Sequence, residues 1–260
     1  MFSIKVLNET GMTKFVAHGE EEVYLVATSE YEPGDRVVLE YSGEPTHVWF
    51  QADDAMGASL LYITGNVEVK IPFGEQRTAT SHKAFIGNCH YLYVKAATEL
   101  EVKQYRNHAI NVYDSHENTT SFPHASANVE TRNEAVFAAR NAIDGIKANS
   151  SHGEWPYDSW GINRDPKACL KVDFGEEIVT DQVVLYLRAD FPHDNWWKEV
   201  TLEFSDGSKV VAQLEKTGRA QKITFPEKTV TYVELKDLIK AESESPFPAL
   251  TQIEVYGTIR

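Results

Sequence analysis

The sequence predicts an all-β protein made of two β-sandwich (jelly-roll) domains. Short segments rich in β-branched and aromatic residues alternate with period two through most of the chain, and Gly, Pro, Asn and Asp separate them. The 260 residues are long for one domain and sufficient for two, each with its own core. Only the stretch near residues 105–122 lacks the alternation. We therefore expect an N-terminal sandwich in residues 1–105, a junction in 106–122 and a second sandwich in 123–260.

The N-terminal half shows alternation in five short segments and no helical period of useful length. Clusters such as Pro33-Gly34-Asp35 and Ser42-Gly43-Glu44-Pro45 are typical of turns between antiparallel strands. Several short strands at this spacing indicate a sandwich or jelly roll of about a hundred residues. The expected strands are residues 23–26, 36–41, 47–50, 60–63 and 91–94.

The segment from residue 105 to 131 is polar and irregular. Its histidines, His108, His116 and His124, raise the idea of a metal site, but their spacing matches no standard site. A hydrated linker packed along the second domain is the favoured interpretation. Residues 131–134 then resemble a capping box, and the good helix formers at 135–142 predict one short helix.

The second half returns to the β pattern after a long irregular stretch. The turn Ser205-Asp206-Gly207-Ser208 indicates a hairpin. With the segments that flank it, the pattern predicts seven or eight strands and hence a second sandwich. The expected strands include residues 170–175, 182–187, 200–204, 222–225, 230–235 and 252–256.

Residues 143–197 hold four of the five tryptophans among His, Asp, Asn, Arg, Gly and Pro, in segments too irregular for one buried face. Exposed aromatic rings beside polar side chains indicate a ligand surface. A ring can pack on the C–H face of a sugar while polar groups bind its hydroxyls. The alternative is that two or three of these tryptophans fill the ends of a sandwich.

Charge and composition limit the partners and the compartment. With 25 basic and 39 acidic residues the formal charge is −14, which argues against nucleic acid and anionic membranes and favours a neutral ligand or a cation. The chain shows no signal peptide and no apolar segment near the ~20 residues that span a bilayer. Cys89 and Cys169 fall in different predicted domains, so we expect reduced, buried thiols in a cytoplasmic protein.

Five segments in the second half occur in the order typical of one family. They are Asn141-Ala142-Ile143-Asp144-Gly145, Trp160, residues 170–175, residues 200–207 and residues 253–257, after an opening Ala125-Ser126-Ala127. Residues 120–260 thus resemble the discoidin, or coagulation-factor C type, domain, a galactose-binding-like jelly roll that is also a common carbohydrate-binding module. The N-terminal half resembles no family that we can name.

The resemblance implies a ligand site in loops at one end of the second sandwich. Residues 185–187 end a predicted core strand, so the chain leaves the sandwich at Arg188 and Pro192 stiffens the loop that follows. Trp196 and Trp197 point in opposite directions if the chain is extended, so we expect one of them to face the ligand and the other to anchor the loop. The predicted ligand-binding residues are Trp155, Arg188, Asp190, His193, Asn195, Trp196 and Trp197. Trp160 matches a position that is frequently in the core.

The resemblance also implies a structural calcium ion. It places ligands at Asp144 and in the following loop around Asn149 and Ser151, and it expects an acid where this chain has Gln252. An amide oxygen carries no charge, so binding to a hard cation should be weaker. The alternative for Asp144 is a helix-ending Asp-Gly turn that needs no metal.

Three hypotheses of function remain open. The first is a non-catalytic protein that binds a neutral sugar or glycan, with a protein partner surface on the N-terminal sandwich and no assigned catalytic residue. The second is a glycan-active enzyme, or an accessory subunit of one, in which Asp190 and Asp194, or Asp53 and Asp54, act as acid and base. The third is a protein-interaction module.

Overall fold

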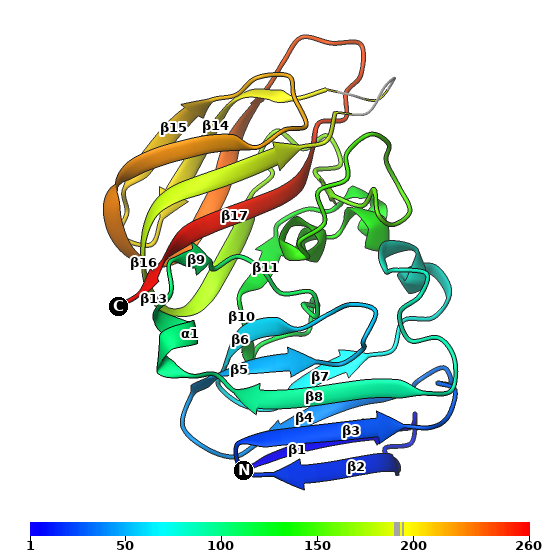
Figure 1. Cartoon of the computed structure of the whole chain (residues 1–260). Helices are drawn as coiled ribbons and strands as arrows, with labels where there is room; N and C mark the ends of the chain where they lie inside the picture. The colour runs from blue at the N-terminus through cyan, green and yellow to red at the C-terminus, as the bar shows by residue number, and fades with distance from the viewer. Residues whose placement is uncertain (190–192, 194) are drawn as a thin grey trace.

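The computed structural model describes residues 1–189, 193 and 195–260. It is mostly β, with three antiparallel sheets and a few short helices. The all-β prediction is therefore confirmed. In Figure 1 the N-terminal half lies below the C-terminal half, and the polypeptide crosses between them near α1 (Glu99–Lys103). No helix in the described part of the chain is long and apolar enough to cross a membrane.

The N-terminal half is a sandwich of two sheets. Alternating burial along each strand turns one face of each sheet into a shared core, as the period-two pattern requires. All five segments that the sequence analysis expected as strands lie inside observed strands. The four-stranded sheet has the order β2 (Thr13–Gly19), β1 (Phe2–Leu7), β4 (Arg36–Tyr41), β7 (Val67–Lys70), and the five-stranded sheet β10 (Ser121–Phe122), β6 (Ser59–Ile63), β5 (Thr46–Gln51), β8 (His90–Ala96), β3 (Glu22–Ala27).

The C-terminal half contains eight strands in one connected sheet around a second core. Two of its strands are much longer than expected, because segments predicted as separate strands are continuous and bend at register shifts near Asp173–Ile178 and Thr180–Gln182. The strands are β9 (Arg106–Asn107), β11 (His124–Ala127), β12 (Trp160–Gly161), β13 (Leu170–Leu187), β14 (Trp197–Phe204), β15 (Lys209–Gln213), β16 (Gln221–Lys240) and β17 (Ala249–Ile259).

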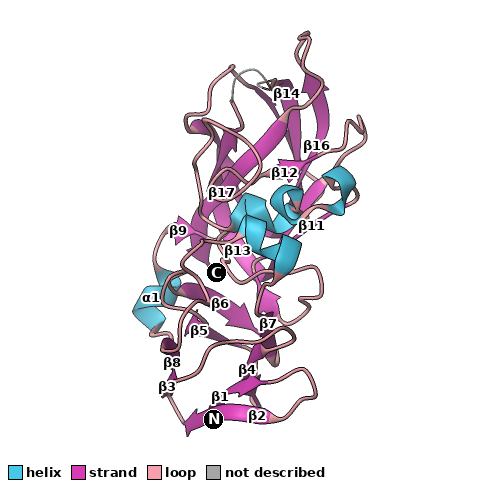
Figure 2. Ribbon diagram, turned by 90° about the vertical axis from the view of Figure 1, so that its right-hand side faces the viewer, coloured by secondary structure: helices cyan, strands magenta, loops and turns pink. Residues whose placement is uncertain are grey.

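Four 3-10 turns gather between the two groups of strands (Figure 2). They are η1 (Gly74–Ala79), η2 (Thr131–Asn133), η3 (Ala135–Phe137) and η4 (Ala139–Ile143). The short helix expected at 131–142 thus takes the form of three turns, and no side-chain hydrogen bond caps the first of them. The capping box lies instead at α1, where Thr98 and Glu101 bond to each other's backbone N–H groups.

The segment expected as the junction contributes to both cores. Ala109 packs in the C-terminal core and Tyr113 in the N-terminal one. Its ends pair in different sheets, since β9 pairs with β17 and β10 with β6. Segment 106–122 therefore links the two cores through packed residues and strand pairs, and the domain boundaries given above stay a prediction.

The three histidines of this region are held by separate partners. The Nε2 atom of His108 lies 3.0 Å from the Gly257 carbonyl oxygen, and burial lowers the pKa of this ring to about 3. His116 pairs with Glu130 at 2.8 Å and His124 with Asp114 at 2.8 Å. Among the described residues, no group of three or more His, Cys, Asp or Glu side chains could hold a metal ion.

The two cysteines differ from the expected buried thiols. Both are free of disulfides, but Cys89 is exposed and Cys169 is only half-buried. The prediction of burial was wrong for Cys89, which lies just before β8 in a loop whose side chains face solvent. Desolvation raises the pKa of the Cys169 thiol to about 11, so this thiol stays protonated near neutral pH.

Candidate functional site

A pocket of about 180 Å³ opens at the loop end of the C-terminal sandwich. Five chain segments meet there: the loop after β13, the loop before β12, the loop after β12, the turns η2 and η3, and the segment that leads into β17. This end of the half lies at the top of Figure 1. The residues that line it are Thr131, Arg132, Phe137, His152, Gly161, Ile162, Asn163, Arg164, Arg188, His193, Phe247 and Pro248.

Arg188 is held rigidly at the base of this pocket. Leu187 ends β13, and the Arg188 backbone N–H still donates to the Ala249 carbonyl on β17 at 3.0 Å. Its Nη2 donates to the Phe247 carbonyl at 2.6 Å, and the side chain is only 5% exposed. The chain leaves the sheet at Arg188 as the sequence analysis expected, and its guanidinium bonds to the Phe247 carbonyl in the segment just before β17.

Two histidines from different loops meet at the pocket. The ring centroids of His152 and His193 are 4.2 Å apart with an edge-to-face angle of 62°. The His193 carbonyl accepts a hydrogen bond from the Ser245 hydroxyl at 3.0 Å, which ties the loop to the segment before β17. This contact brings the loop around residue 152 and the loop after β13 to one place.

The other wall has an unusual backbone. Arg132, Asn163 and Arg164 line the pocket with φ values of 53°, 47° and 62°, in the left-handed region. Left-handed residues other than glycine are uncommon and each costs free energy, so they persist where the surrounding structure holds a particular side-chain position. Three of them around one pocket indicate a built site.

Two arginine–aromatic contacts complete this wall. The Arg164 guanidinium lies 4.5 Å from the centroid of the Phe247 ring. Arg132 lies 5.7 Å from the Phe137 ring and is paired through two hydrogen bonds with Glu134 at 2.6 and 2.7 Å. Such contacts present planar guanidinium groups in fixed orientations beside apolar rings.

The predicted ligand-binding residues are placed differently from one another. Arg188 and His193 line the pocket. Asn195 is buried, and its amide donates to the Ser245 carbonyl at 2.5 Å while its oxygen accepts the Trp196 N–H. Asp190 lies outside the described residues, as does Asp194 of the enzyme hypothesis.

None of the four tryptophans in residues 143–197 lines the pocket. Trp160 and Trp197 are fully buried with ring centroids 6.3 Å apart, and Trp196 is half-buried against the same core. Trp155 donates its backbone N–H to Thr78 in η1 at 2.7 Å, away from the pocket. Trp197 is thus the anchoring tryptophan of its pair, and the alternative of tryptophans that fill the sandwich describes Trp160 and Trp197.

Sequence reasoning missed several lining residues. Arg132 was assigned to a capping box, and Asn163 and Arg164 gave no signal because their left-handed backbone is not visible in residue type. His152 lay inside the tryptophan-rich stretch but was not selected. The adjacent pair Asn163-Arg164 after the tryptophan at 160 could have suggested a turn.

The four residues expected at the calcium site have different surroundings. The Gln252 oxygen accepts the Gly145 N–H at 3.0 Å, the Asn149 amide donates to Gly218, and Ser151 is exposed. Asp144 instead has a second carboxylate, Asp158, as its electrostatic neighbour; burial first and this neighbour second raise the pKa of Asp144 well above its usual range. Asp158 is 3% exposed, and both of its oxygens lack a hydrogen bond within the described chain. The half-buried Asp144 carboxylate and the buried Asp158 carboxylate are donors that fit a hard cation.

The carboxylate pair of Asp53 and Asp54 does not form an acid–base pair at a cleft. Asp53 is buried and its two oxygens accept the backbone N–H groups of Ala55 and Phe85, both at 2.8 Å. Asp54 is exposed. Asp53 therefore braces a loop, and Asp54 is the solvated member of the pair.

These features define a two-sandwich β protein with a polar pocket at the loop end of its second sandwich. The model of the family described as "Domain of unknown function (DUF7402)" matches residues 118–256, more than half of the chain. The chain belongs to this family. No curated protein sequence matches it.

Solved structures with a similar fold are carbohydrate-binding modules. Chitosan-binding module 1 of a chitosanase/glucanase from Paenibacillus sp. IK-5 is 21% identical over 59% of this chain and 100% of its own, with a TM-score of 0.41. The family 32 module of NanJ from C. perfringens, in complex with galactose, is 18% identical over 51% and 91%, with 0.36. The Streptococcus pneumoniae fucose binding module SpX-3 is 15% identical over 52% and 93%, with 0.38. All three scores are below 0.5, so the fold assignment depends on the chain's own sheets.

Proposed function

We propose that the pocket at the loop end of the second sandwich binds a carbohydrate without catalysis. The observation that carries the proposal is the set of left-handed residues Arg132, Asn163 and Arg164, which face Arg188 and His193 across the pocket. The protein bears the strain of these conformations to hold the Arg132 and Arg164 guanidinium groups next to the Phe137 and Phe247 rings. Fixed polar donors beside apolar rings match the hydroxyls and C–H faces of a sugar.

A neutral sugar is the expected ligand. The arginines of the pocket already have protein partners, since Arg132 pairs with Glu134, Arg188 donates to Phe247 and Arg164 lies over the Phe247 ring. The chain as a whole carries a formal charge of −14, which repels anions at long range. Affinity should be modest, because an open pocket exchanges water hydrogen bonds for sugar ones at small net gain.

A glycan array followed by calorimetric titration tests this function. We expect binding of neutral glycans without turnover, and we expect His193→Ala to weaken it at least tenfold. Lys167→Ala, an exposed position in the same loop as Asn163 that does not line the pocket, is the matched control and should bind like the original protein. If no glycan binds, or if His193→Ala and Lys167→Ala bind equally well, the pocket is not a sugar site.

We further propose a structural calcium ion that Asp144, one of the four residues that the sequence suggested, and its neighbour Asp158 would hold. An ion there would neutralise two carboxylates that otherwise repel each other. Calcium should then raise the melting temperature, and chelator should lower it. In Asp158→Asn the calcium response should be lost, whereas Asp54→Asn, an exposed acid in the other half, should keep it. An equal response of both variants would argue against this site.

A further inference from the structure

Strand β7 is the open edge of the four-stranded sheet. It pairs with β4 alone, in a register that places Lys70 opposite Arg36 and Val69 opposite Val37. The Ile71 N–H donates to the Asp35 carbonyl at 3.1 Å. Ile71 and Asp35, which follow the Lys70–Arg36 pair in this register, are therefore a hydrogen-bonded pair. Hydrogen-bonded and non-bonded pairs alternate in an antiparallel ladder. Val69 therefore bonds to β4, and the backbone groups of Glu68 and Lys70 point away from it.

These outward groups have no partner within the described chain. No hydrogen bond reaches the backbone N–H or C=O of Glu68 or Lys70 from any residue that the structure describes. An edge of this kind is a template for another strand unless something covers it.

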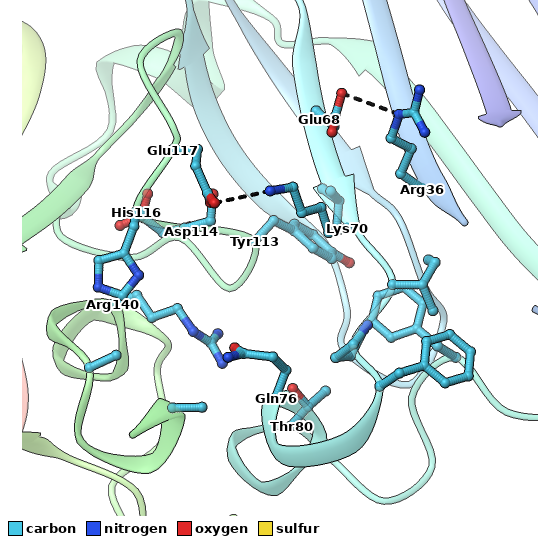
Figure 3. Close-up of a pocket in the computed structure, with 18 of the residues that line it drawn as sticks. Arg36, Glu68, Lys70, Gln76, Thr80, Tyr113, Asp114, His116, Glu117 and Arg140 are labelled. Atoms are coloured by element: carbon cyan, nitrogen blue, oxygen red, sulfur yellow. Dashed lines mark hydrogen bonds and ion pairs between the residues drawn. The ribbon is translucent and has the colours of Figure 1, made fainter. Parts of the chain in front are cut away.

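A groove runs along this edge. Two cavities, of about 720 and 310 Å³, share Glu68, Lys70, Ser115 and Glu117 as lining residues. The segment after Tyr113 forms the wall opposite β7, so the edge strand lies on one side of the groove and the junction segment on the other. In Figure 3 Lys70 reaches across to Glu117, and Gln76, Thr80 and Arg140 lie at the far end.

The larger cavity has apolar lining residues at its floor. An exposed ion pair crosses the groove at its rim. Met56, Ile71, Phe73, Phe85 and Val112 supply the floor. The Lys70–Glu117 ion pair that crosses the groove has an N–O distance of 3.0 Å, with side chains 65% and 68% exposed. Exposed ion pairs add little stability, so this bridge opens readily.

We propose that the groove binds an extended peptide that adds to β7 as an antiparallel strand. Backbone hydrogen bonds to Glu68 and Lys70 would provide the attachment, as in other cases of strand addition. A peptide residue opposite Val69 directs its side chain to the inward face, toward the apolar floor. Its two neighbours lie on the outward face opposite Lys70 and Glu68.

The charges of the edge define the peptide. An acidic residue complements Lys70 and a basic residue complements Glu68. In the antiparallel direction the preferred peptide therefore reads acid, large apolar residue, base from its N-terminus. A second copy of this chain is not the occupant, because its edge strand carries neighbouring strands about 4.8 Å behind it, which would collide with the wall at Ser115 and Glu117.

A blocked pentapeptide Thr-Glu-Leu-Lys-Thr tests the site by NMR titration of the whole protein. We expect shifts at the amides of Glu68 and Lys70. N-methylation of the peptide's glutamate nitrogen, which would bond to β7, should weaken binding at least tenfold, whereas N-methylation of its leucine nitrogen, which points away, should change it less than threefold. The peptide with Glu and Lys exchanged should bind more weakly than the original.

Two protein variants distinguish the contribution of the Lys70 backbone N–H to peptide binding from that of the Lys70 charge. Lys70→Pro removes an N–H that β4 does not use, so the fold should persist while peptide binding falls at least tenfold. Lys70→Gln keeps the N–H and should lose only the preference for the acidic residue. Failure of the pentapeptide to bind, equal effects of the two N-methylations, or dimerisation of the protein that Lys70→Pro abolishes would each overturn the proposal. The N-methyl series decides the matter even if Lys70→Pro does not fold.

Discussion

At the scale of single residues, the pocket of the second sandwich combines backbone strain with binding geometry. Arg164 is exposed, has a φ of 62° and lies over the Phe247 ring. A left-handed conformation costs an L-residue about 1–2 kcal/mol, and glycine avoids that cost but loses about 0.5–1 kcal/mol of chain entropy. The Arg164 side chain is therefore retained at a net expense of stability, which is what a binding role explains.

Arg164→Gly tests whether the strained backbone at this position lowers stability and serves binding. We expect the free energy of unfolding to stay equal or rise by up to about 1 kcal/mol, while sugar binding falls at least fivefold because the guanidinium is lost. Asp237→Gly is the matched control, since Asp237 also has a positive φ, 49°, but lies on β16 outside the pocket. It should gain similar stability and keep full binding. Denaturant unfolding and calorimetric titration measure the two quantities, and a loss of binding in both variants would contradict the role of Arg164.

The His124–Asp114 pair predicts a pH dependence of stability. The hydrogen bond to the buried Asp114 carboxylate raises the pKa of His124, against the effect of burial, and Asp173 adds to the rise while His116 opposes it. Because the folded-state pKa is the higher one, the stabilisation is fully present below about pH 6.5 and is lost as the pH rises through the folded value. His124→Gln should cost about 1 kcal/mol at pH 6 and much less at pH 9. Chemical unfolding at both pH values measures this, and a cost that does not change with pH would show that the pair is uncharged.

At the scale of elements, what the sequence could predict follows the range of the interactions. Each strand was predicted from local alternation, and all of the predicted strands appear in the structure. A strand with one buried face alternates apolar and polar residues, so neighbouring residues are enough to reveal it. The continuity of β13 and β16 could not be read, since Gly175 and Pro226 look like turn residues yet lie within bent strands. One part of the pocket could be predicted, because Arg188 follows the end of a strand. Other lining residues, such as Asn163, could not, because only the tertiary fold brings them near Arg188. The apolar groove at β7 depends on strand order, which no local pattern contains.

The start of β14 separates two adjacent tryptophans by burial. Trp197 is fully buried beside Trp160, whereas Trp196 is half-buried with Lys216 over its ring at 5.5 Å. Trp197→Ala should lower the free energy of unfolding by about 3–5 kcal/mol and Trp196→Ala by less than half of that, because only the first leaves a closed cavity. Neither ring lines the pocket, so Trp196→Ala should keep sugar binding. Equal destabilisation by the two substitutions in urea unfolding would contradict this assignment.

At the scale of the whole molecule, the two halves are joined by contacts outside the polypeptide crossing. The His47 ring lies 2.6 Å from the Glu176 carboxylate, the Trp155 N–H donates to the Thr78 carbonyl in η1, and the Ala135 N–H donates to the Glu75 carboxylate in the same turn. Each contact comes from a different part of the chain, so opening one half exposes apolar surface of the other. The pocket of the second sandwich and the groove at β7 are consequently fixed relative to each other, so the ligands of the two proposed sites would be held at a set distance.

This coupling predicts a single thermal transition for the whole chain, and Gly175 is the place to break it. Gly175 has a φ of +73°, and a Cβ there would meet ring atoms of Phe122 at 2.4 Å, at the contact between the bend of β13 and β10. Gly207 is the matched control, because it has a φ of +81° in a hairpin turn with open space around it. Gly207→Ala should cost only the backbone strain, about 1–2 kcal/mol, and leave one transition. Gly175→Ala should cost more and split the calorimetric transition in two, because the added methyl group pushes Phe122 away and separates the cores. Two transitions in the unmodified protein would show that the halves unfold independently, and identical scans for the two variants would show that the contact between Gly175 and Phe122 does not couple them.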